Sequence, residues 1–396
     1  MQPSILCSAV PREATSDRCE SDTSPVPARE FYETLRPLCL FNLRRTRASK
    51  TGLYELQIRD RRSGEVNRRE RLTSTAICLI ALHRDGLDAA DETLDAHRAM
   101  DALVECLRHE RYAGALGLVV WASAVWQAMP LEKLLRRVAL PTQDVRRLAA
   151  SLTTMELAWL VSGALHEHAR RPTGDTGQLV EQGVESLWGR FCADSQLMLH
   201  ALPQAPTKER WRRFIANFAD QIYSVQALSL DAIVRKRSRS LETAHACASR
   251  LVALQGERGQ WWWHYDVRRG GCVARHYPVF SVHQYGMAPM ALAALAEAGG
   301  TDFRSAADKG RAWLNANELN ATLIDRDWKT IWRDIEPADS LPRRVIRDLK
   351  SLYGGPARRP PATRLEINFE TRPYEWGWCL YHGAIVRGQE KGGQIV

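Results

Sequence analysis

Six blocks of small and apolar residues, spread along the whole chain, constrain the fold more than any other feature of the sequence. In each block the apolar residues cover more than one face of a helix, which is the pattern of a helix surrounded by other helices. Alternating strand patterns and Asn-Gly turns are nearly absent, so we expect an almost wholly helical protein. The blocks are 72–82, 115–128, 155–165, 221–233, 287–298 and 376–386.

Amphipathic segments with a single apolar stripe lie between or after these blocks. They are 91–108, 131–140, 208–218, 241–254, 303–314 and 343–352. Six buried helices that alternate with six outer ones predict an all-α fold, an (α/α)6 toroid with irregular loops at one mouth. The inner helices of such a ring surround an axis, and the loops that enter their N-termini meet at that mouth. An open helical solenoid is the alternative.

Length and composition indicate one folded domain in a reducing compartment. We expect residues 28–390 to form the toroid and residues 1–27, which are rich in Ser, Pro and charge, to be disordered. The nine cysteines are scattered and form no C-x-x-C pair, which favours a cytoplasmic location over a disulfide framework. The sequence contains no apolar run long enough for a transmembrane segment and no secretory signal.

The net charge of +9 comes mostly from clustered arginines. Because no nucleic-acid-binding motif accompanies them, we interpret the clusters as a solvated surface and expect no nucleic-acid partner. The charge would still attract an anionic small molecule or glycan. The oligomeric state is left open.

Residues 255–298 carry the densest group of chemically useful side chains. Three tryptophans stand in a row and cannot all point the same way, so we expect at least one to line a pocket and at least one to be core. Indole faces bind the C–H surfaces of sugars or stabilise cations. Pro289 fits the first turn of the following helix, so we expect the polar residues before it at the helix mouth. The residues concerned are Trp261, Trp262, Trp263, His264, Asp266, Tyr277, His283 and Gln284.

A second cluster, NFETRPYEWGWCLY, precedes and opens the sixth inner helix. Arg372 is a candidate anion clamp and Glu375 a candidate acid or base, with Trp376 beside them. The alternative is that these acidic residues only favour the positive end of the helix dipole.

Other inner helices begin with further polar residues. Glu156 lies in an apolar helix, where a carboxylate needs a partner, and Asp220 and Tyr223 open the fourth inner helix. Arg333 lies in the IWRDIE segment. A toroid would bring these positions to one rim, so we expect the catalytic candidates to share one cavity: His283, Asp266, Glu375, Glu156, Asp220 and His264. The candidates for substrate binding are Trp262, Trp263, Tyr277, Gln284, Arg372 and Trp376.

Neither a metal nor a cofactor is predicted. The types of His264, Asp266, Cys272, His276 and His283 would suit zinc, but their spacing matches no zinc motif. The phosphate-binding loop, the dinucleotide fingerprint and the G-x-S-x-G elbow are also missing from the sequence.

The run LVALQGERGQWW at 251–262, followed by a loop and an Ala/Leu helix, resembles the repeats of the squalene cyclase and prenyltransferase superfamily. That resemblance implies an α/α toroid. The chain lacks the D-x-D-D and D-D-x-x-D motifs and the zinc ligands on which catalysis in that superfamily depends. In architecture and residue type it is equally similar to (α/α)6 enzymes of carbohydrate metabolism, which include glycosidases, polysaccharide lyases and sugar epimerases.

From these features we expect a cytoplasmic carbohydrate-active enzyme that acts on an anionic sugar or glycan intermediate. Rim carboxylates would act as general acid and base, with their pKa values kept apart by burial and neighbours. His283 or Tyr277 would replace one of them if the reaction abstracts a proton beside a uronate. The alternatives are an isoprenoid-handling toroid, in which tryptophans face a carbocation, and a non-catalytic toroid that binds a ligand or partner.

Overall fold

The computed structural model describes residues 26–54, 57–59, 65–67, 72–87, 95–110, 112–140, 142–339, 346 and 358–389. The expected disordered segment lies outside these residues apart from its last two positions. The expected outer helix at 343–352 also lies outside them, apart from residue 346. Neither prediction is therefore tested.

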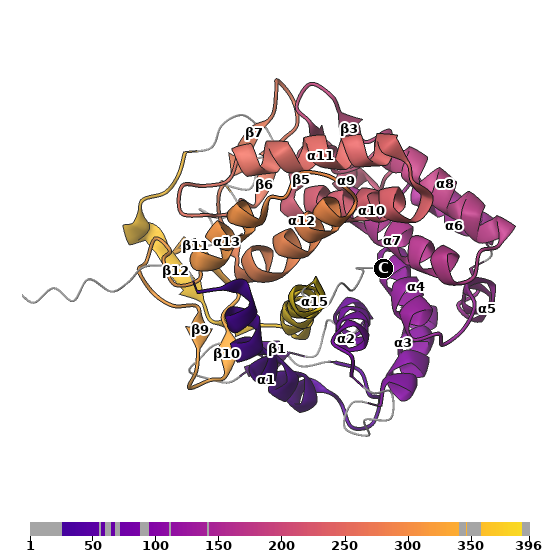
Figure 1. Ribbon diagram of the computed structural model, residues 1–396, viewed down its shortest axis with the longest axis horizontal. Coiled ribbons are helices and arrows are strands. Elements are labelled where there is room, and N and C mark those ends of the chain that lie inside the picture. Colours follow the sequence, from indigo (N-terminus) through magenta and orange to yellow (C-terminus); the bar gives the residue numbers. More distant parts are fainter. Residues whose placement is uncertain are drawn as a thin grey trace, which may run out of the picture.

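Six helices form a closed inner ring. Each packs against the next one along the chain, and the last returns to contact the first (Figure 1). All six correspond to the predicted buried blocks, which confirms the toroid and excludes an open solenoid. They are α2 (Leu72–Arg84), α4 (Leu116–Val125), α7 (Thr154–Arg170), α10 (Phe218–Arg235), α12 (Ala288–Glu297) and α15 (Pro373–Gln389).

The inner helices approach closely because their contact positions are small. A Cβ atom added to Gly117 of α4 would lie 2.2 Å from the backbone nitrogen of Leu160 in α7. One added to Gly163 of α7 would lie 2.4 Å from the carbonyl oxygen of Gly117. The two backbones therefore touch, and no larger residue fits at either position without moving a helix.

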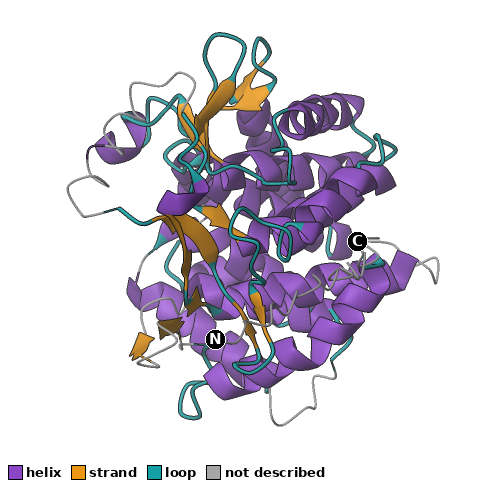
Figure 2. Cartoon of the chain, turned by 90° about the vertical axis from the view of Figure 1, so that its left-hand side faces the viewer, coloured by secondary structure: helices purple, strands orange, loops and turns teal. Residues whose placement is uncertain are grey.

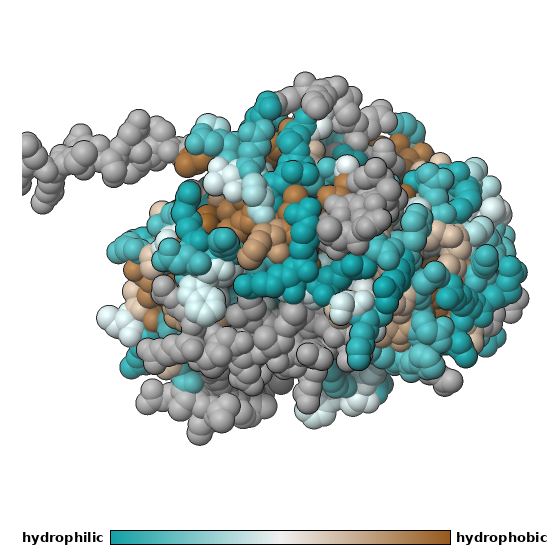
Figure 3. All heavy atoms as spheres, turned by 90° about the horizontal axis from the view of Figure 1, so that it is seen from below, coloured by the Kyte–Doolittle hydropathy of each residue, from teal (hydrophilic) through white to brown (hydrophobic). Residues whose placement is uncertain are grey.

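An outer layer packs around this ring (Figure 1). Helix α1 packs on α15, α3 on α2, α8 on α7, α11 on α10 and α13 on α12. On the face seen in Figure 3, hydrophilic side chains predominate, with hydrophobic ones between them, as expected for amphipathic outer helices. The outer helices are α1 (Ala28–Thr46), α3 (Ala96–Glu110), α5 (Leu131–Arg137), α6 (Thr142–Ala149), α8 (Gly174–Trp188), α11 (Ser238–Ala253) and α13 (Arg304–Ala312).

The predicted outer helix at 208–218 is wrong. Only α9 (Thr207–Arg210) is helical there, and β5 (Ile215–Asn217) follows it. Asn217 is the N-cap of α10 with extended φ and ψ of −88° and 167°, so no helix can run through it. The outer helix at this place is α8, whose glycines weaken its helical pattern in the sequence. Helix α1 was also not predicted.

Short strands are a second difference from the prediction. Within the described residues, thirteen strands of two to four residues form five antiparallel sheets, ordered β13-β1-β2, β10-β9, β12-β11-β8, β3-β4 and β5-β6-β7 (Figure 2). Several lead directly into inner helices. Strands this short carry no readable alternation.

The strands not yet located are β1 (Gln57–Arg59), β2 (Glu65–Asn67), β3 (Phe191–Cys192), β4 (Leu197–Met198), β6 (His264–Asp266), β7 (Cys272–Arg275), β8 (Val279–Phe280), β9 (Ile324–Asp325), β10 (Thr330–Ile331), β11 (Asp334–Pro337), β12 (Leu365–Asn368) and β13 (Glu370–Thr371). There are also two short 3-10 turns, η1 (Ala113–Ala115) and η3 (Ala362–Arg364).

In the part of the chain that the structure describes, no helix has the length and apolarity needed to cross a membrane.

Candidate active site at the mouth of the toroid

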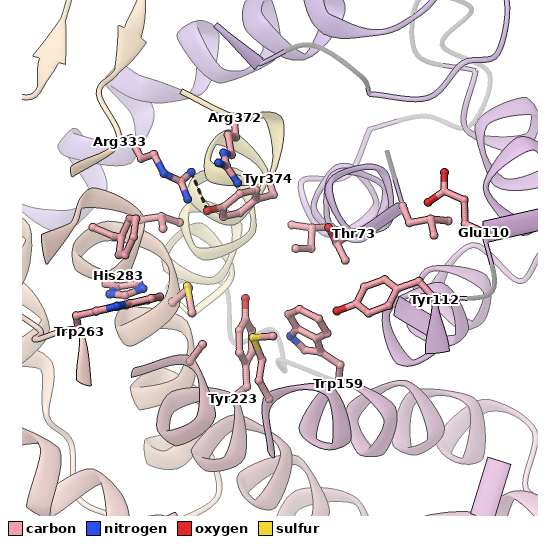
Figure 4. Close-up of a pocket in the computed structure, with 17 residues that line it drawn as sticks. Thr73, Glu110, Tyr112, Trp159, Tyr223, Trp263, His283, Arg333, Arg372 and Tyr374 are labelled. Carbon is pink, nitrogen blue, oxygen red and sulfur yellow. Dashed lines mark hydrogen bonds between the residues drawn. The ribbon is translucent and has the colours of Figure 1, made fainter. Parts of the chain in front are cut away.

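A cavity of about 390 Å³ lies where the N-terminal ends of the inner helices meet (Figure 4). Each of the six inner helices contributes a lining residue from its first turns or from the segment that enters it. A ring of helices thus builds the site from positions more than 300 residues apart in sequence. The lining residues are Leu72, Thr73, Ile77, Glu110, Tyr112, Met155, Trp159, Ala219, Tyr223, Trp263, Phe280, Val282, His283, Met287, Arg333, Arg372 and Tyr374.

Aromatic rings form two walls of the cavity. Trp159 of α7 and Tyr223 of α10 meet edge to face, with ring centroids 5.4 Å apart. Trp263 and Phe280 form a second edge-to-face pair at 4.8 Å. Figure 4 shows Trp159 and Tyr223 side by side and Trp263 beneath His283. Such rings offer flat apolar surfaces to a ligand that is itself flat and partly apolar.

Arg333 places a permanent positive charge at the cavity. Its Nη1 atom donates to Glu375 Oε1 at 2.6 Å and to the Tyr374 hydroxyl at 3.2 Å, and its Nε atom lies 3.5 Å from Glu370 Oε1. Burial alone would lower the pKa of Arg333, but Tyr374 and the carboxylates outweigh it and raise that pKa. Arg372, which also lines the cavity, donates through Nε to Glu370 Oε1 at 2.5 Å.

Two buried carboxyl groups stand behind Arg333. Burial raises the pKa of Glu375 to about 7, although Arg333 and Arg372 oppose this shift. Burial also raises the pKa of Asp334 to about 8, again against the influence of Arg333. Neither side chain belongs to the described lining of the cavity. Both lie against the Arg333 guanidinium, and Asp334 Oδ2 is 3.6 Å from its Nε atom.

A π-helical turn, η2 (His283–Met287), carries His283 into the cavity wall ahead of α12. Pro289 lies in the first turn of α12 and has no N–H to donate to the carbonyl of Tyr285 four residues earlier. That carbonyl instead accepts a hydrogen bond of 2.7 Å from the Tyr32 hydroxyl of α1. The widened turn therefore has a local cause, and π-turns are frequent at functional sites.

His283 is a neutral imidazole in aromatic surroundings. Its ring lies 4.6 Å from that of Phe218 and 5.1 Å from that of Phe280, between centroids. Burial, assisted by the charge of Arg333, lowers the pKa of His283 to about 3. Its Nδ1 atom is buried without a hydrogen-bond partner among the described residues. At neutral pH this side chain is therefore uncharged, and its low pKa makes it a weak base in the unliganded protein.

The three consecutive tryptophans divide between core and cavity. Trp261 and Trp262 are 1% and 4% exposed and belong to the core. Trp263 lines the cavity, stacked 4.9 Å from the ring of His264 and 6.1 Å from that of His283. One of the three tryptophans therefore faces the cavity, and the other two pack in the core.

Three of the carboxylates named as catalytic candidates are helix caps. Glu156 Oε2 accepts from the Thr153 backbone N–H at 2.9 Å, and Asp220 Oδ2 accepts from that of Asn217 at 2.9 Å. Glu375 Oε2 accepts a hydrogen bond from the backbone N–H of Arg372 at 3.1 Å. Each carboxylate satisfies a backbone donor at a helix start, as in a capping box. None of the three is among the described lining residues.

Two of these caps also support the wall of the cavity. Glu156 Oε1 accepts from the Tyr112 hydroxyl at 2.8 Å, and Asp220 Oδ1 accepts from the backbone N–H of Met155 at 3.0 Å. Asp220 also pairs with His200, whose other ring nitrogen lies 2.9 Å from Glu209. The carboxylates thus hold lining residues in position from behind.

The remaining candidates lie around the cavity and not against it. His264 and Asp266 are on β6, where Arg212 contacts His264 at 3.2 Å and Arg268 pairs with Asp266 at 2.9 Å. Tyr277 donates to Glu318 at 2.5 Å. The other three are buried: Trp262, Gln284 and Trp376. The expectation that all six catalytic candidates share one cavity therefore differs from the structure, in which His283 alone of the six lines it.

Several lining residues were not among the sequence-based candidates. Glu110 is the last residue of α3, Tyr112 lies between α3 and α4, and Trp159 belongs to the second turn of α7. Among the described lining residues, Glu110 is the one carboxylate, and Figure 4 shows it across the cavity from His283. The one feature of the sequence that could have indicated Glu110 as a lining residue is its position just before an inner helix. In the described part of the chain, no three His, Cys, Asp or Glu side chains gather as a metal site.

Comparison with known proteins identifies the fold. No family model and no curated protein matches the sequence. Solved structures do match, among them the unsaturated glucuronyl hydrolase of Bacillus sp. GL1, with a TM-score of 0.58 and 13% identity over 91% of this chain and 97% of that one.

Two further neighbours have the same architecture. An unsaturated glucuronyl hydrolase specific for heparin matches with a TM-score of 0.58 and 11% identity, over 92% of this chain and 97% of that one. The enzyme of Streptococcus agalactiae matches with a TM-score of 0.56 and 10% identity, over 91% and 92% of the two chains. The chain therefore has the (α/α)6 toroid fold that unsaturated glucuronyl hydrolases also have.

Proposed function

We propose that this chain is a carbohydrate-active enzyme that acts on an anionic sugar at the mouth of the toroid by general acid/base chemistry. The observation that carries the proposal is the content of the cavity. Flat aromatic walls, two guanidinium groups and a neutral imidazole meet in a space of about 390 Å³. Sugars stack on aromatic rings, and guanidinium groups bind carboxylates or sulfates through paired hydrogen bonds.

Arg333 and Arg372 would bind the anionic group of the substrate. Arg333 is held rigidly by Glu375 and Tyr374, so little conformational freedom is lost when it binds an anion. The apolar faces of Trp263 and Trp159 would take the sugar rings. In the alternative isoprenoid reaction, the same two guanidinium groups would repel the carbocation that the aromatic rings would have to stabilise.

His283 would act as the base. Burial is the main cause of its low pKa and the charge of Arg333 the second; an anion bound at Arg333 would oppose that charge and raise the pKa of His283 in the complex. Glu110, across the cavity in Figure 4, would supply the second acid/base group. Two such groups on different sides of a sugar would serve an inverting hydrolysis or an anti elimination.

The structural neighbours support the choice of substrate. The Bacillus protein is described as responsible for the degradation of glycosaminoglycan. A Streptococcus agalactiae homologue was solved in complex with dGlcA-GalNAc6S, with 10% identity to this chain. We also propose a cytoplasmic location, which the free cysteines Cys39, Cys78, Cys247 and Cys379, all buried, support.

The test is incubation of the protein in D₂O with saturated and unsaturated uronate disaccharides, followed by mass spectrometry. Hydrolysis divides the disaccharide and adds the elements of water, a lyase divides it without water, and an epimerase returns it with one deuterium on carbon. We expect one of these changes, and we expect His283→Gln to abolish it. Binding without any change would indicate a non-catalytic toroid, and turnover of an allylic diphosphate instead would indicate an isoprenoid enzyme.

A further inference from the structure

Trp211, in the segment 208–214 beside the cavity, is 75% exposed to solvent. Among the described residues, its side chain makes no recorded ring contact or hydrogen bond. Phe214, on the same segment, is 39% exposed and lies between two guanidinium groups, 5.0 Å from that of Arg213 and 5.5 Å from that of Arg268. An exposed aromatic ring beside guanidinium groups offers a face on which a sugar can stack and donors that can bind an anion.

The segment is held firmly, so the exposure of Trp211 does not come from a loose loop. The Arg213 carbonyl accepts from the His200 N–H at 2.9 Å, and the Phe214 carbonyl accepts from the Val267 N–H at 3.0 Å. Glu209 contacts His200 through its side chain at 2.9 Å. The backbone on either side of Trp211 is therefore held in place, and the indole projects from it into solvent.

The segment is also continuous with the cavity wall. Arg212 contacts His264, and His264 stacks on Trp263, which lines the cavity. On the other side, Glu209 is close enough to Tyr112, another lining residue, to contribute to the raised pKa of that phenol, after burial and Glu156. A ligand that extends out of the cavity would pass over this segment.

The charge of the segment matches an anionic chain. Its cations are Lys208, Arg210, Arg212 and Arg213, and its one carboxylate, Glu209, is paired with His200 and Lys208. A polyanionic glycan offers negative groups at each repeat and flat sugar faces between them, which fits cations interleaved with aromatic rings.

We propose that Trp211, Phe214 and the arginines beside them form an outer subsite that binds the sugars of an anionic glycan extending out of the cavity. This proposal rests on the proposed function of the cavity and adds that the substrate is an oligosaccharide longer than a disaccharide. Trp211 provides the stacking surface, and Arg213 and Arg210 contact the anionic groups.

The experiment is calorimetric titration with chondroitin sulfate di-, tetra- and hexasaccharides that end in an unsaturated uronate, in a His283→Gln background so that the ligand is not consumed. We expect affinity to rise with length. Trp211→Ala should leave disaccharide affinity unchanged and weaken hexasaccharide binding by about two- to tenfold, the usual range for one aromatic contact. Folding should be unaffected, because the side chain is mostly in water.

Phe41→Ala is the matched control. Phe41 on α1 is 42% exposed and flanked by Arg45 and Lys329, at 5.7 and 4.8 Å from its ring, but it lies on an outer helix. The Phe41→Ala variant should bind each of the three oligosaccharides with the same affinity as the His283→Gln background protein.

The outcomes separate the two proposals. The outer subsite is refuted, and the cavity assignment stands, if the protein binds the disaccharide but its affinity does not rise with oligosaccharide length. The same holds if Trp211→Ala keeps the full rise in affinity. If the protein binds none of these glycans, both proposals fail. Trp211-dependent binding of a single-stranded oligonucleotide, with no dependence on glycan length, would also overturn the subsite.

Discussion

Replacing the adjacent tryptophans one at a time tests whether the structure assigns core and cavity correctly. Trp261 is 1% exposed and packs 5.8 Å from the ring of Phe218. Trp261→Ala removes a fully buried indole and should cost about 3–5 kcal/mol of unfolding free energy. Trp263 makes aromatic contacts with His264, Phe280 and His283. Its indole is only partly buried, so Trp263→Ala should cost less, about 1–3 kcal/mol for the aromatic contacts and the buried part of the ring together.

A second readout distinguishes a cavity tryptophan from a merely less buried one. Trp263 covers the ring of His283, so Trp263→Ala should admit water and raise the pKa of His283 toward its ordinary value. Urea unfolding gives the stabilities, and NMR titration of the histidine ring gives the pKa. Trp261→Ala, where it remains folded, should leave the ligand affinity of the cavity largely intact. Equal losses of stability in both variants, with no shift at His283, would refute the assignment.

Two further predictions concern the supports behind the cavity. Asp220→Ala should cost about 3 kcal/mol or more of stability, because it leaves His200 buried without its 2.7 Å partner and leaves the Asn217 N–H without the acceptor that Asp220 supplies in the capping box of α10. Urea unfolding that resembles that of the unmodified protein would contradict this. Burial opposes protonation of His200, but Asp220 and Glu209 outweigh it and raise its pKa above the ordinary value. That contribution to stability is complete below pH 6.5, the unfolded value, and is lost as pH rises through the higher folded pKa. Glu209→Gln should therefore flatten the fall of stability above pH 6.5, and an unchanged slope would count against the pairing.

The sequence predicts the inner ring well because a buried helix leaves a direct mark on composition. A block such as 116–125 has no polar face, and such a segment is stable only inside other helices. The outer layer is harder to predict. Residues 208–218 carry apolar side chains at helical spacing, yet Asn217 has to adopt an extended conformation to cap α10. The extended N-cap conformation of Asn217 excludes a continuous helix through this segment, and the spacing of apolar residues gives no indication of that conformation.

The site was predictable in location but less so in its members. His283, Trp263 and Arg372 were named because they precede inner helices, and they do line the cavity. Glu156, Asp220 and Glu375 satisfy the same criterion, but their carboxylates turn back to cap the helix. For the first two, the capping-box spacing of three residues from Thr153 and from Asn217 was a signal for this alternative. Glu110 and Tyr112 have no motif, and only the ring closure brings them opposite His283.

Calorimetric titration with dGlcA-GalNAc6S determines whether the cavity binds an anionic sugar. Arg372→Gln removes one lining guanidinium. Arg304→Gln, at a side chain that is 72% exposed on α13, removes the same charge outside the site. We predict that the unmodified protein and Arg304→Gln bind alike and that Arg372→Gln binds about tenfold or more weakly, as for a lost charge-assisted hydrogen bond. Equal binding by the two variants, or no binding by the unmodified protein, would contradict the account.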